Sequence, residues 1–169
     1  HAIALTTPRL RIDAVTPADL PALHRIVTRP AVARMLLRYH PAMTVDEAAT
    51  LLLQSALVPP LRLAVRHGGQ VIGSVSLIEG TPPHLTYFLD PDHAGQGLGQ
   101  EMVSAVFDEV VARLAPSEIV AEVFLDNPAS RKILKNLGFR RDEDALITSR
   151  GRDASAQAAR YRWRAGLLS

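Results

Sequence analysis

The segment of residues 85–99 combines an apolar strand-like stretch with three closely spaced glycines. The stretch of residues 85–89 is rich in β-branched and aromatic residues, Gly95, Gly97 and Gly99 follow it, and an amphipathic helical pattern opens after Gly99. Glycine has no Cβ, so backbone N–H groups in such a loop can approach a ligand closely. The following helix adds unpaired N–H donors and a partial positive charge. The sequence therefore predicts a phosphate or pyrophosphate site, the alternative being a glycine turn that binds nothing.

Two common nucleotide-binding motifs are disfavoured by the same loop. It carries no lysine and lacks the phosphate-loop pattern that ends in Lys and Ser or Thr, which argues against a nucleoside triphosphatase. Its glycines are spaced G-x-G-x-G rather than G-x-G-x-x-G, and they occur late in the chain after strands that we expect to be antiparallel, which argues against a dinucleotide fold.

A second strand-to-helix junction lies at residues 126–131. Asn127 is a good helix cap, Pro128 fits the first helical position and Ser130 is the third residue, so local capping alone is one interpretation. Ligands often bind in the crevice outside strand ends. Two junctions with unusual glycine or polar content therefore predict a cleft at that edge of the sheet.

The elements expected to position these junctions form a mixed pattern. Thr44 and Glu47 form a capping box at the start of one helix, and His67, Gly68 and Gly69 read as a hairpin turn. We expect helices over 17–27, 32–37, 44–57 and 128–137, with a long helix opening after residue 99. We expect strands over 10–15, 61–65, 71–78, 85–89 and 119–125, and one or two more around 145–148 and 160–163.

Length and composition predict one globular domain over residues 1–169, because domains usually have about 100–200 residues. The absence of cysteine excludes disulfides, thiolate metal sites and a cysteine nucleophile, and fits a reducing cytoplasm. No apolar run approaches the roughly 18–20 residues that span a bilayer, so we expect no membrane partner.

Charge is unevenly distributed. Residues 131–169 hold ten Arg or Lys and four Asp or Glu, whereas residues 1–130 hold nine Arg and thirteen acidic residues. The basic end is suited to a phosphorylated ligand or nucleic acid, or is a solvated edge. Residues 131–169 hold only three aromatic residues for stacking on bases, Phe139, Tyr161 and Trp163, so we expect no nucleic acid partner.

Together the two junctions resemble those of the GCN5-related N-acetyltransferases (GNAT), which transfer an acyl group from acyl-coenzyme A (acyl-CoA) to an amine. The similarity is greatest to the branch that acetylates the N-termini of ribosomal proteins. It covers about residues 8–165 and implies an α+β fold, with a mixed, mostly antiparallel central sheet, flanking helices and one splayed pair of strands. The residues that carry the resemblance are Tyr87-Phe88-Leu89-Asp90-Pro91, Gln96-Gly97-Leu98-Gly99-Gln100-Glu101, Asn127-Pro128-Ala129-Ser130, Leu134 and Leu137-Gly138-Phe139.

The resemblance implies a binding mode for acetyl-CoA as cosubstrate, with no metal. The pantetheine arm pairs with backbone near Phe88 and Leu89, Asn127 hydrogen-bonds the arm, and Ser130 lies near the sulfur. Ala94 departs from the family, which usually has Arg or Gln at that position. The residues implied to bind pyrophosphate are Gly95, Gln96, Gly97, Leu98, Gly99 and Gln100. Those implied to bind the 3′-phosphate are Arg131, Lys132 and Lys135, or these three form a solvated helix face.

Acyl transfer requires a neutral amine, a donor to the thioester carbonyl and a proton for the thiolate. We expect a backbone N–H near Leu89 at the carbonyl, and Ser130 at the sulfur with Tyr87 as second candidate or as a packing aromatic. Glu79 is the candidate base, and His84 and Asp90 are alternatives. Without cysteine, direct attack in a ternary complex follows.

The expected acceptor is a peptide N-terminus or a small-molecule amine. The early helical region of residues 17–57 carries Arg25, Arg29, Arg34, Arg38 and His40 against three acidic residues, which argues mildly against a strongly cationic acceptor. The competing hypothesis is an inactive acyl-CoA-binding module, and we expect a monomer or a homodimer.

Overall fold

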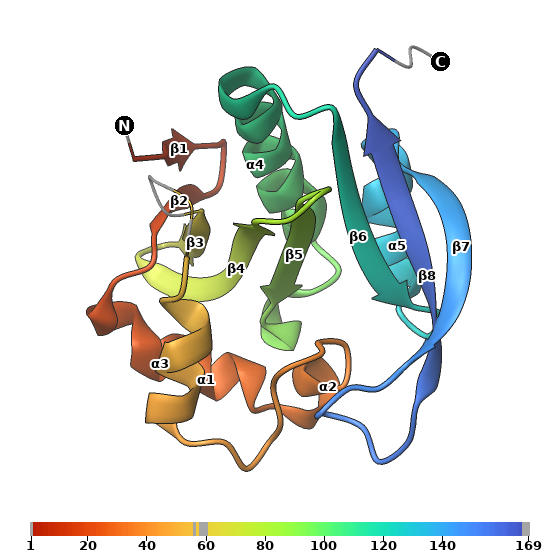
Figure 1. The fold of residues 1–169 in the computed structure, drawn as a ribbon. Coiled ribbons are helices and arrows are strands. Elements are labelled where there is room, and N and C mark those ends of the chain that lie inside the picture. The colour runs from red at the N-terminus through yellow and green to blue at the C-terminus, as the bar shows by residue number, and fades with distance from the viewer. Residues whose placement is uncertain (1, 56, 58–60, 167–169) are drawn as a thin grey trace.

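The computed structural model describes residues 2–55, 57 and 61–166, which build one eight-stranded sheet (Figure 1). The strand order is β1-β2-β3-β4-β5-β6-β8-β7. Every neighbouring pair is antiparallel except β5 and β6, which confirms the expected mixed, mostly antiparallel sheet. The strands are β1 (Ala4–Thr6), β2 (Arg11–Ala14), β3 (Arg62–His67), β4 (Gln70–Ile78), β5 (His84–Leu89), β6 (Glu118–Phe124), β7 (Arg140–Ile147) and β8 (Ala156–Arg164).

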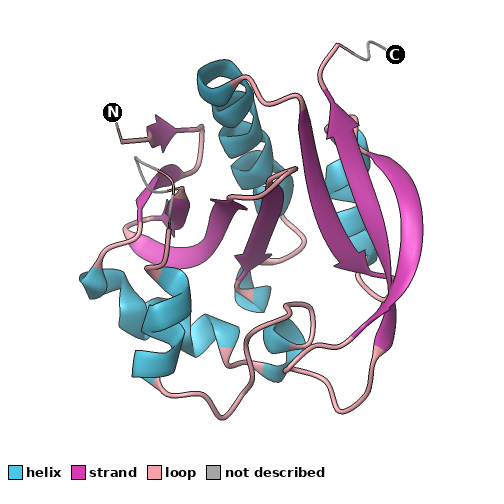
Figure 2. Ribbon diagram, in the orientation of Figure 1, coloured by secondary structure: helices cyan, strands magenta, loops and turns pink. Residues whose placement is uncertain are grey.

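Helices pack on both faces of the sheet (Figure 2). They are η1 (Pro17–Asp19), α1 (Leu20–Val27), α2 (Pro30–Ala33), α3 (Val45–Leu52), η2 (Pro91–His93), α4 (Leu98–Leu114) and α5 (Pro128–Asn136). Successive strand residues face opposite sides. Accordingly, Tyr87 of β5 packs in the core formed with α4 and α5, whereas Phe88 packs in a second core formed with α1 and α3. Within the described ranges, no helix is long and apolar enough to cross a membrane.

The strands β5 and β6 form a fork. Their only register pair joins His84 to Val120, and the N–H of Val120 also donates to the carbonyl of Pro83 at 3.0 Å. From that closed end the strands diverge toward Leu89 and Phe124 (Figure 1). The fork is the splayed pair that the resemblance implied.

The expected helix over 32–37 is wrong in its bounds. Pro30 starts α2 at its first helical position, and the helix ends at Ala33. The carbonyls of the next residues accept bonds from the loop between β7 and β8 instead of from the next helical turn. The N–H of Arg150 donates to Leu37 at 3.0 Å, and Nε of Arg152 donates to Arg34 at 2.7 Å.

The expected helix over 44–57 is also too long. The capping box of Thr44 and Glu47 is present, but α3 ends at Leu52. Past that residue the buried stripe stops, and the carbonyl of Gln54 accepts a bond of 2.8 Å from Nε of Arg62. Residue 56 of the expected helix lies outside the described residues.

The two C-terminal strands are longer than predicted. Most of β7 is exposed and charged, so it lacks the apolar alternation that indicates a strand. Its pairing with β8 is accompanied by ion pairs, among them Arg162 with Asp142 at 3.0 Å. The short strand β1 was not predicted.

Candidate active site

The glycine loop ends β5 and opens α4. Gly95 and Gly97 have φ values of 80° and 79°, and Gly97 is the N-cap of α4. This left-handed backbone is costly for any residue with a Cβ. A Cβ at Gly99 would lie 3.2 Å from Cδ1 of Ile133, so this glycine allows close packing of α4 on α5. The loop therefore places the first N–H groups of α4 at the open end of the fork.

An arginine from the segment before β2 reaches this loop. Nη1 of Arg9 donates to the carbonyl of Gln96 at 2.8 Å, and its Nε donates to Glu101 at 2.8 Å. Nη2 of Arg9 would lie 3.4 Å from a Cβ at Gly97. A guanidinium thus lies beside the loop whose own position 94 is alanine. Arg9 was not predicted from the sequence, and Glu101, the acidic residue in the first turn of α4, is the one signal that could have indicated a basic partner.

Tyr87, Asn127 and Ser130 come together where the fork is open. The hydroxyls of Tyr87 and Ser130 are 2.6 Å apart, and Oδ1 of Asn127 accepts from the N–H of Ser130 at 3.3 Å. Ser130 is buried. Burial raises the pKa of Tyr87 well above its usual value, although the hydrogen bond to Ser130 opposes this. Tyr87 is therefore a protonated donor at neutral pH.

The edge of β5 that faces β6 is unpaired beside this hydroxyl pair. A Cβ at Gly73 would lie 2.4 Å from the carbonyl oxygen of Phe88, so that carbonyl faces β4. In a strand the backbone groups of successive residues point to opposite edges. The N–H groups of Tyr87 and Leu89 therefore point toward the side from which β6 has diverged, where they can pair with an extended ligand.

The remaining coenzyme candidates lie on α4 and α5. The side-chain amide of Gln100 bridges the two helices, donating to Ser104 and accepting from Asn136 at 2.9 Å each. Lys132 and Lys135 are exposed. Nε of Arg131 is buried and has no hydrogen-bond partner within the described part of the chain. Leu98 is buried in the core at the start of α4, so only its backbone is available to a ligand.

The three candidate bases have different environments. Asp90 caps η2 and pairs with Arg29 at 2.6 Å, so its carboxylate is engaged. Nε2 of His84 lies 3.5 Å from Glu122 at the closed end of the fork. Hydrogen bonding from His84, followed by Arg160, keeps the pKa of Glu122 below its usual value despite burial. Glu122 was not predicted from the sequence.

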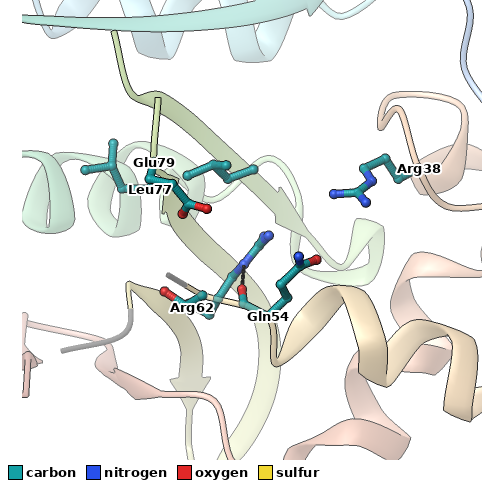
Figure 3. A pocket seen from close by; sticks show the side chains of 7 residues that line it. Arg38, Gln54, Arg62, Leu77 and Glu79 are labelled. Atoms are coloured by element: carbon teal, nitrogen blue, oxygen red, sulfur yellow. Dashed lines mark hydrogen bonds between the residues drawn. The ribbon is translucent and has the colours of Figure 1, made fainter. Parts of the chain in front are cut away.

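Glu79 lines a cavity of about 80 Å³ just beyond the end of β4 (Figure 3). The other lining residues are Arg38, Gln54, Ser55, Arg62, Leu77 and Ile78. Across the sheet, Ile78 pairs with His84 of β5, so the cavity adjoins the strand that forms one arm of the fork. Among the residues described, no three His, Asp or Glu side chains gather as a metal site.

Comparison with known proteins identifies the family and the fold. Residues 9–140 match the acetyltransferase (GNAT) domain family. An uncharacterised N-acetyltransferase of Bacillus subtilis (strain 168), YoaA, is 24% identical over an alignment of 148 residues that covers 82% of this chain and 83% of YoaA. RimL, a ribosomal L7/L12 alpha-N-protein acetyltransferase solved with coenzyme A, superposes with a TM-score of 0.81 at 18% identity, covering 97% of this chain and 98% of RimL. Spermidine N-acetyltransferase of Vibrio cholerae, solved with CoA and spermine, gives 0.79 at 18% identity, covering 94% and 96% of the two chains.

Proposed function

Because this chain belongs to the acetyltransferase (GNAT) family, we propose that it transfers an acetyl group from acetyl-CoA to a primary amine of a peptide N-terminus or a small molecule. The observation that carries the proposal is the open edge of β5 beside the paired hydroxyls of Tyr87 and Ser130. Backbone donors and a proton source meet there, as acyl transfer from a thioester requires.

The coenzyme lies along the fork in this proposal. The N–H groups of residues 95–100 and the positive end of α4 hold the pyrophosphate. Arg9 supplies the charge that Ala94 does not, and Arg131 and Lys135 face the 3′-phosphate. The pantetheine arm pairs with β5 near Phe88 and Leu89, and Asn127 hydrogen-bonds the arm. CoA bound in the RimL structure supports this use of the fold.

The chemistry is direct attack in a ternary complex. The amine nitrogen attacks the thioester carbonyl, whose oxygen accepts from the N–H of Leu89 as negative charge develops. The carbon–sulfur bond breaks, and Ser130 hydrogen-bonds the departing sulfur. Tyr87 stays protonated because its pKa is raised, so it can donate to the Ser130 hydroxyl, and the departing thiolate takes up a proton through this hydroxyl pair, which solvent reprotonates. The amine loses its proton through water to Glu79, and His84 is the alternative acceptor.

A thermal-shift measurement followed by a turnover assay tests the proposal. A ligand present at 100 times its Kd stabilises the native state by about 2.7 kcal/mol. We expect acetyl-CoA and CoA to raise the melting temperature, and thiol release to depend on an added amine. Binding without thiol release across an amine panel would instead support the inactive acyl-CoA-binding module, and absence of binding would contradict both.

A further inference from the structure

The cavity beyond β4 has an unusual charge balance for a half-buried space. Two arginines enter it from segments far apart in the chain, Arg62 from β3 and Arg38 from the connection between α2 and α3 (Figure 3). Glu79 lies at its exposed rim. Neither arginine has a carboxylate within 4.0 Å in the described part of the chain. Residues 56 and 58–60, which lie outside the described ranges, carry no acidic side chain.

Arg62 is the residue that most needs a partner. It is partly buried, and within the described part of the chain its guanidinium makes one hydrogen bond, from Nε to the carbonyl of Gln54 at 2.8 Å. Burial is the main cause that lowers its pKa and Arg38 adds to it, whereas Tyr39 and Glu79 oppose the shift, and the arginine stays charged. Glu79 attracts this charge from beyond ion-pair distance, and a carboxylate within hydrogen-bond distance would match the planar donor fork of the guanidinium. The cavity therefore favours a ligand that brings its own carboxylate.

The position of the cavity connects it to the acyl-transfer site. Arg62 pairs across the sheet with Ser76, which in turn pairs with Thr86 of β5, so all three side chains share one face. Phe88 lies on this same face, and its ring centroid is 6.4 Å from that of Tyr39. Neighbouring strands are about 4.8 Å apart, so Arg62 begins about 10 Å from β5. A ligand that spans this distance has several bonds between its carboxylate and its amine.

We propose that Arg62 and Arg38 bind the carboxylate of the acceptor, and that the acceptors are amines carrying a carboxylate several bonds from the nitrogen, such as ω-amino carboxylates and short acidic peptides. This proposal rests on the proposed acetyltransferase activity. The proposed site disfavours polyamines as acceptors, because the two arginines repel a second ammonium group and attract a carboxylate.

Length-matched acceptors test the proposal directly. Thiol release from acetyl-CoA is measured with 6-aminohexanoate, hexylamine and 1,6-diaminohexane, which share a six-carbon chain and end in a carboxylate, a methyl group and an ammonium group. We expect kcat/KM to be at least about tenfold higher for 6-aminohexanoate than for the other two. A factor of ten corresponds to about 1.4 kcal/mol, within the range of a hydrogen bond to a charged group. Equal kcat/KM values, or a preference for the diamine, would overturn the proposal.

Variants locate the effect. Arg62→Gln and Arg38→Gln each lower the ratio of kcat/KM for 6-aminohexanoate to kcat/KM for hexylamine toward one. Arg25→Gln removes the same charge from an exposed position on α1 and serves as the matched control. Arg38 is exposed, so its variant keeps the test valid if replacement of Arg62 impairs folding. Retention of the preference in Arg38→Gln and in a folded Arg62→Gln protein would contradict the assignment.

A binding measurement separates failure of this proposal from failure of the proposed activity. If acetyl-CoA binds but no amine releases thiol, the activity is wrong, and the cavity is then tested with 6-aminohexanoate by isothermal titration calorimetry. Saturable binding to the wild type that is lost in Arg38→Gln would support a carboxylate site. No binding to the wild type would reject it.

Discussion

The two sides of the fork are built in different ways. On the proposed coenzyme side, the loop through Gly95 and Gly97 offers backbone N–H groups, and its residues are adjacent in sequence. On the proposed acceptor side, the cavity is lined by the side chains of Arg38, Arg62 and Glu79, which come from three separate segments. Backbone donors suit the part of a ligand that is the same in every reaction cycle, such as the coenzyme. Side chains suit the acceptor, because they can differ between proteins that act on different substrates. A motif therefore identifies the first side, and only the folded chain identifies the second.

Gly97→Asp makes the largest expected change. The residue needs φ of 79°, and aspartate adds both a Cβ and a negative charge beside the proposed pyrophosphate. We expect CoA affinity to fall by roughly 100-fold or more, about 3 kcal/mol. Calorimetric titration with CoA measures the change.

Gly166→Asp is the control for backbone strain. Gly166 also has φ of 79° with open space around a Cβ, and it follows β8 at the end of the sheet away from the glycine loop (Figure 1). We expect this variant to keep wild-type CoA affinity. If both variants bind CoA normally, the loop does not hold the pyrophosphate.

Asp19→Asn tests whether side-chain pairs maintain the acceptor side. Asp19 is buried next to α1 and accepts bonds of 2.7 and 3.0 Å from Arg66 of β3. When the carboxylate of Asp19 is removed, Arg66 keeps its ion pair with Asp13, so we expect the free energy of unfolding to fall by roughly 2–3 kcal/mol. Denaturant unfolding measures this loss. CoA affinity of the folded variant should stay unchanged, and a loss of CoA affinity would contradict the separation of the two sides.

The same pair gives a pH dependence with a definite sign. Burial alone raises the pKa of Asp19, but hydrogen bonds from Arg66 and Thr16 outweigh it, so the pKa lies below its usual value. The stabilisation is therefore complete above the unfolded pKa of about 3.9 and is lost as the pH falls through the lower folded value. The wild type should lose more stability than Asp19→Asn between about pH 4 and pH 2. Parallel losses would show that the pair contributes little.

The sequence predicted the parts of the fold that are determined by residues adjacent in the chain. The capping box at Thr44, the hairpin at Gly68 and the glycine loop depend on neighbouring residues, and all three are present. The fork followed from the family resemblance. The bounds of α2 were wrong because the carbonyl of Leu37 bonds to Arg150, which is more than a hundred residues away. No local pattern contains that contact.

The candidate site divides in the same way. Tyr87 and Ser130 were selected separately by motif, and the structure adds that their hydroxyls are 2.6 Å apart. Glu122 was missed because it lies within an otherwise buried strand, and its relation to His84 depends on the pairing of β5 with β6. The roles assigned to these residues remain predictions.

Ser130→Ala and Tyr87→Phe test the hydroxyl pair with a smaller expected effect. Each removes one partner of the 2.6 Å contact, so we expect kcat to fall roughly 10- to 100-fold with little change in KM for acetyl-CoA. Steady-state kinetics measure both parameters. Thr148→Val, which removes an exposed hydroxyl just after β7, is the control. Wild-type kcat in both test variants would remove the proposed proton donor.

Arg9→Gln gives the smallest expected effect and sharpens the comparison, because it removes a side chain from the side built on backbone. The guanidinium is partly exposed and holds Gln96 and Glu101, so it both orients the loop and adds charge. We expect CoA affinity to fall about fivefold to tenfold, as for an exposed charge contact of about 1 kcal/mol.

Glu101→Gln weakens the ion pair that holds Arg9 at the loop but keeps the positive charge of Arg9. If calorimetry shows a loss in Arg9→Gln that exceeds the loss in Glu101→Gln and shrinks at high salt, the charge of Arg9 compensates for Ala94. Equal, salt-independent losses would assign Arg9 a purely structural role, and the coenzyme side would then depend on backbone alone.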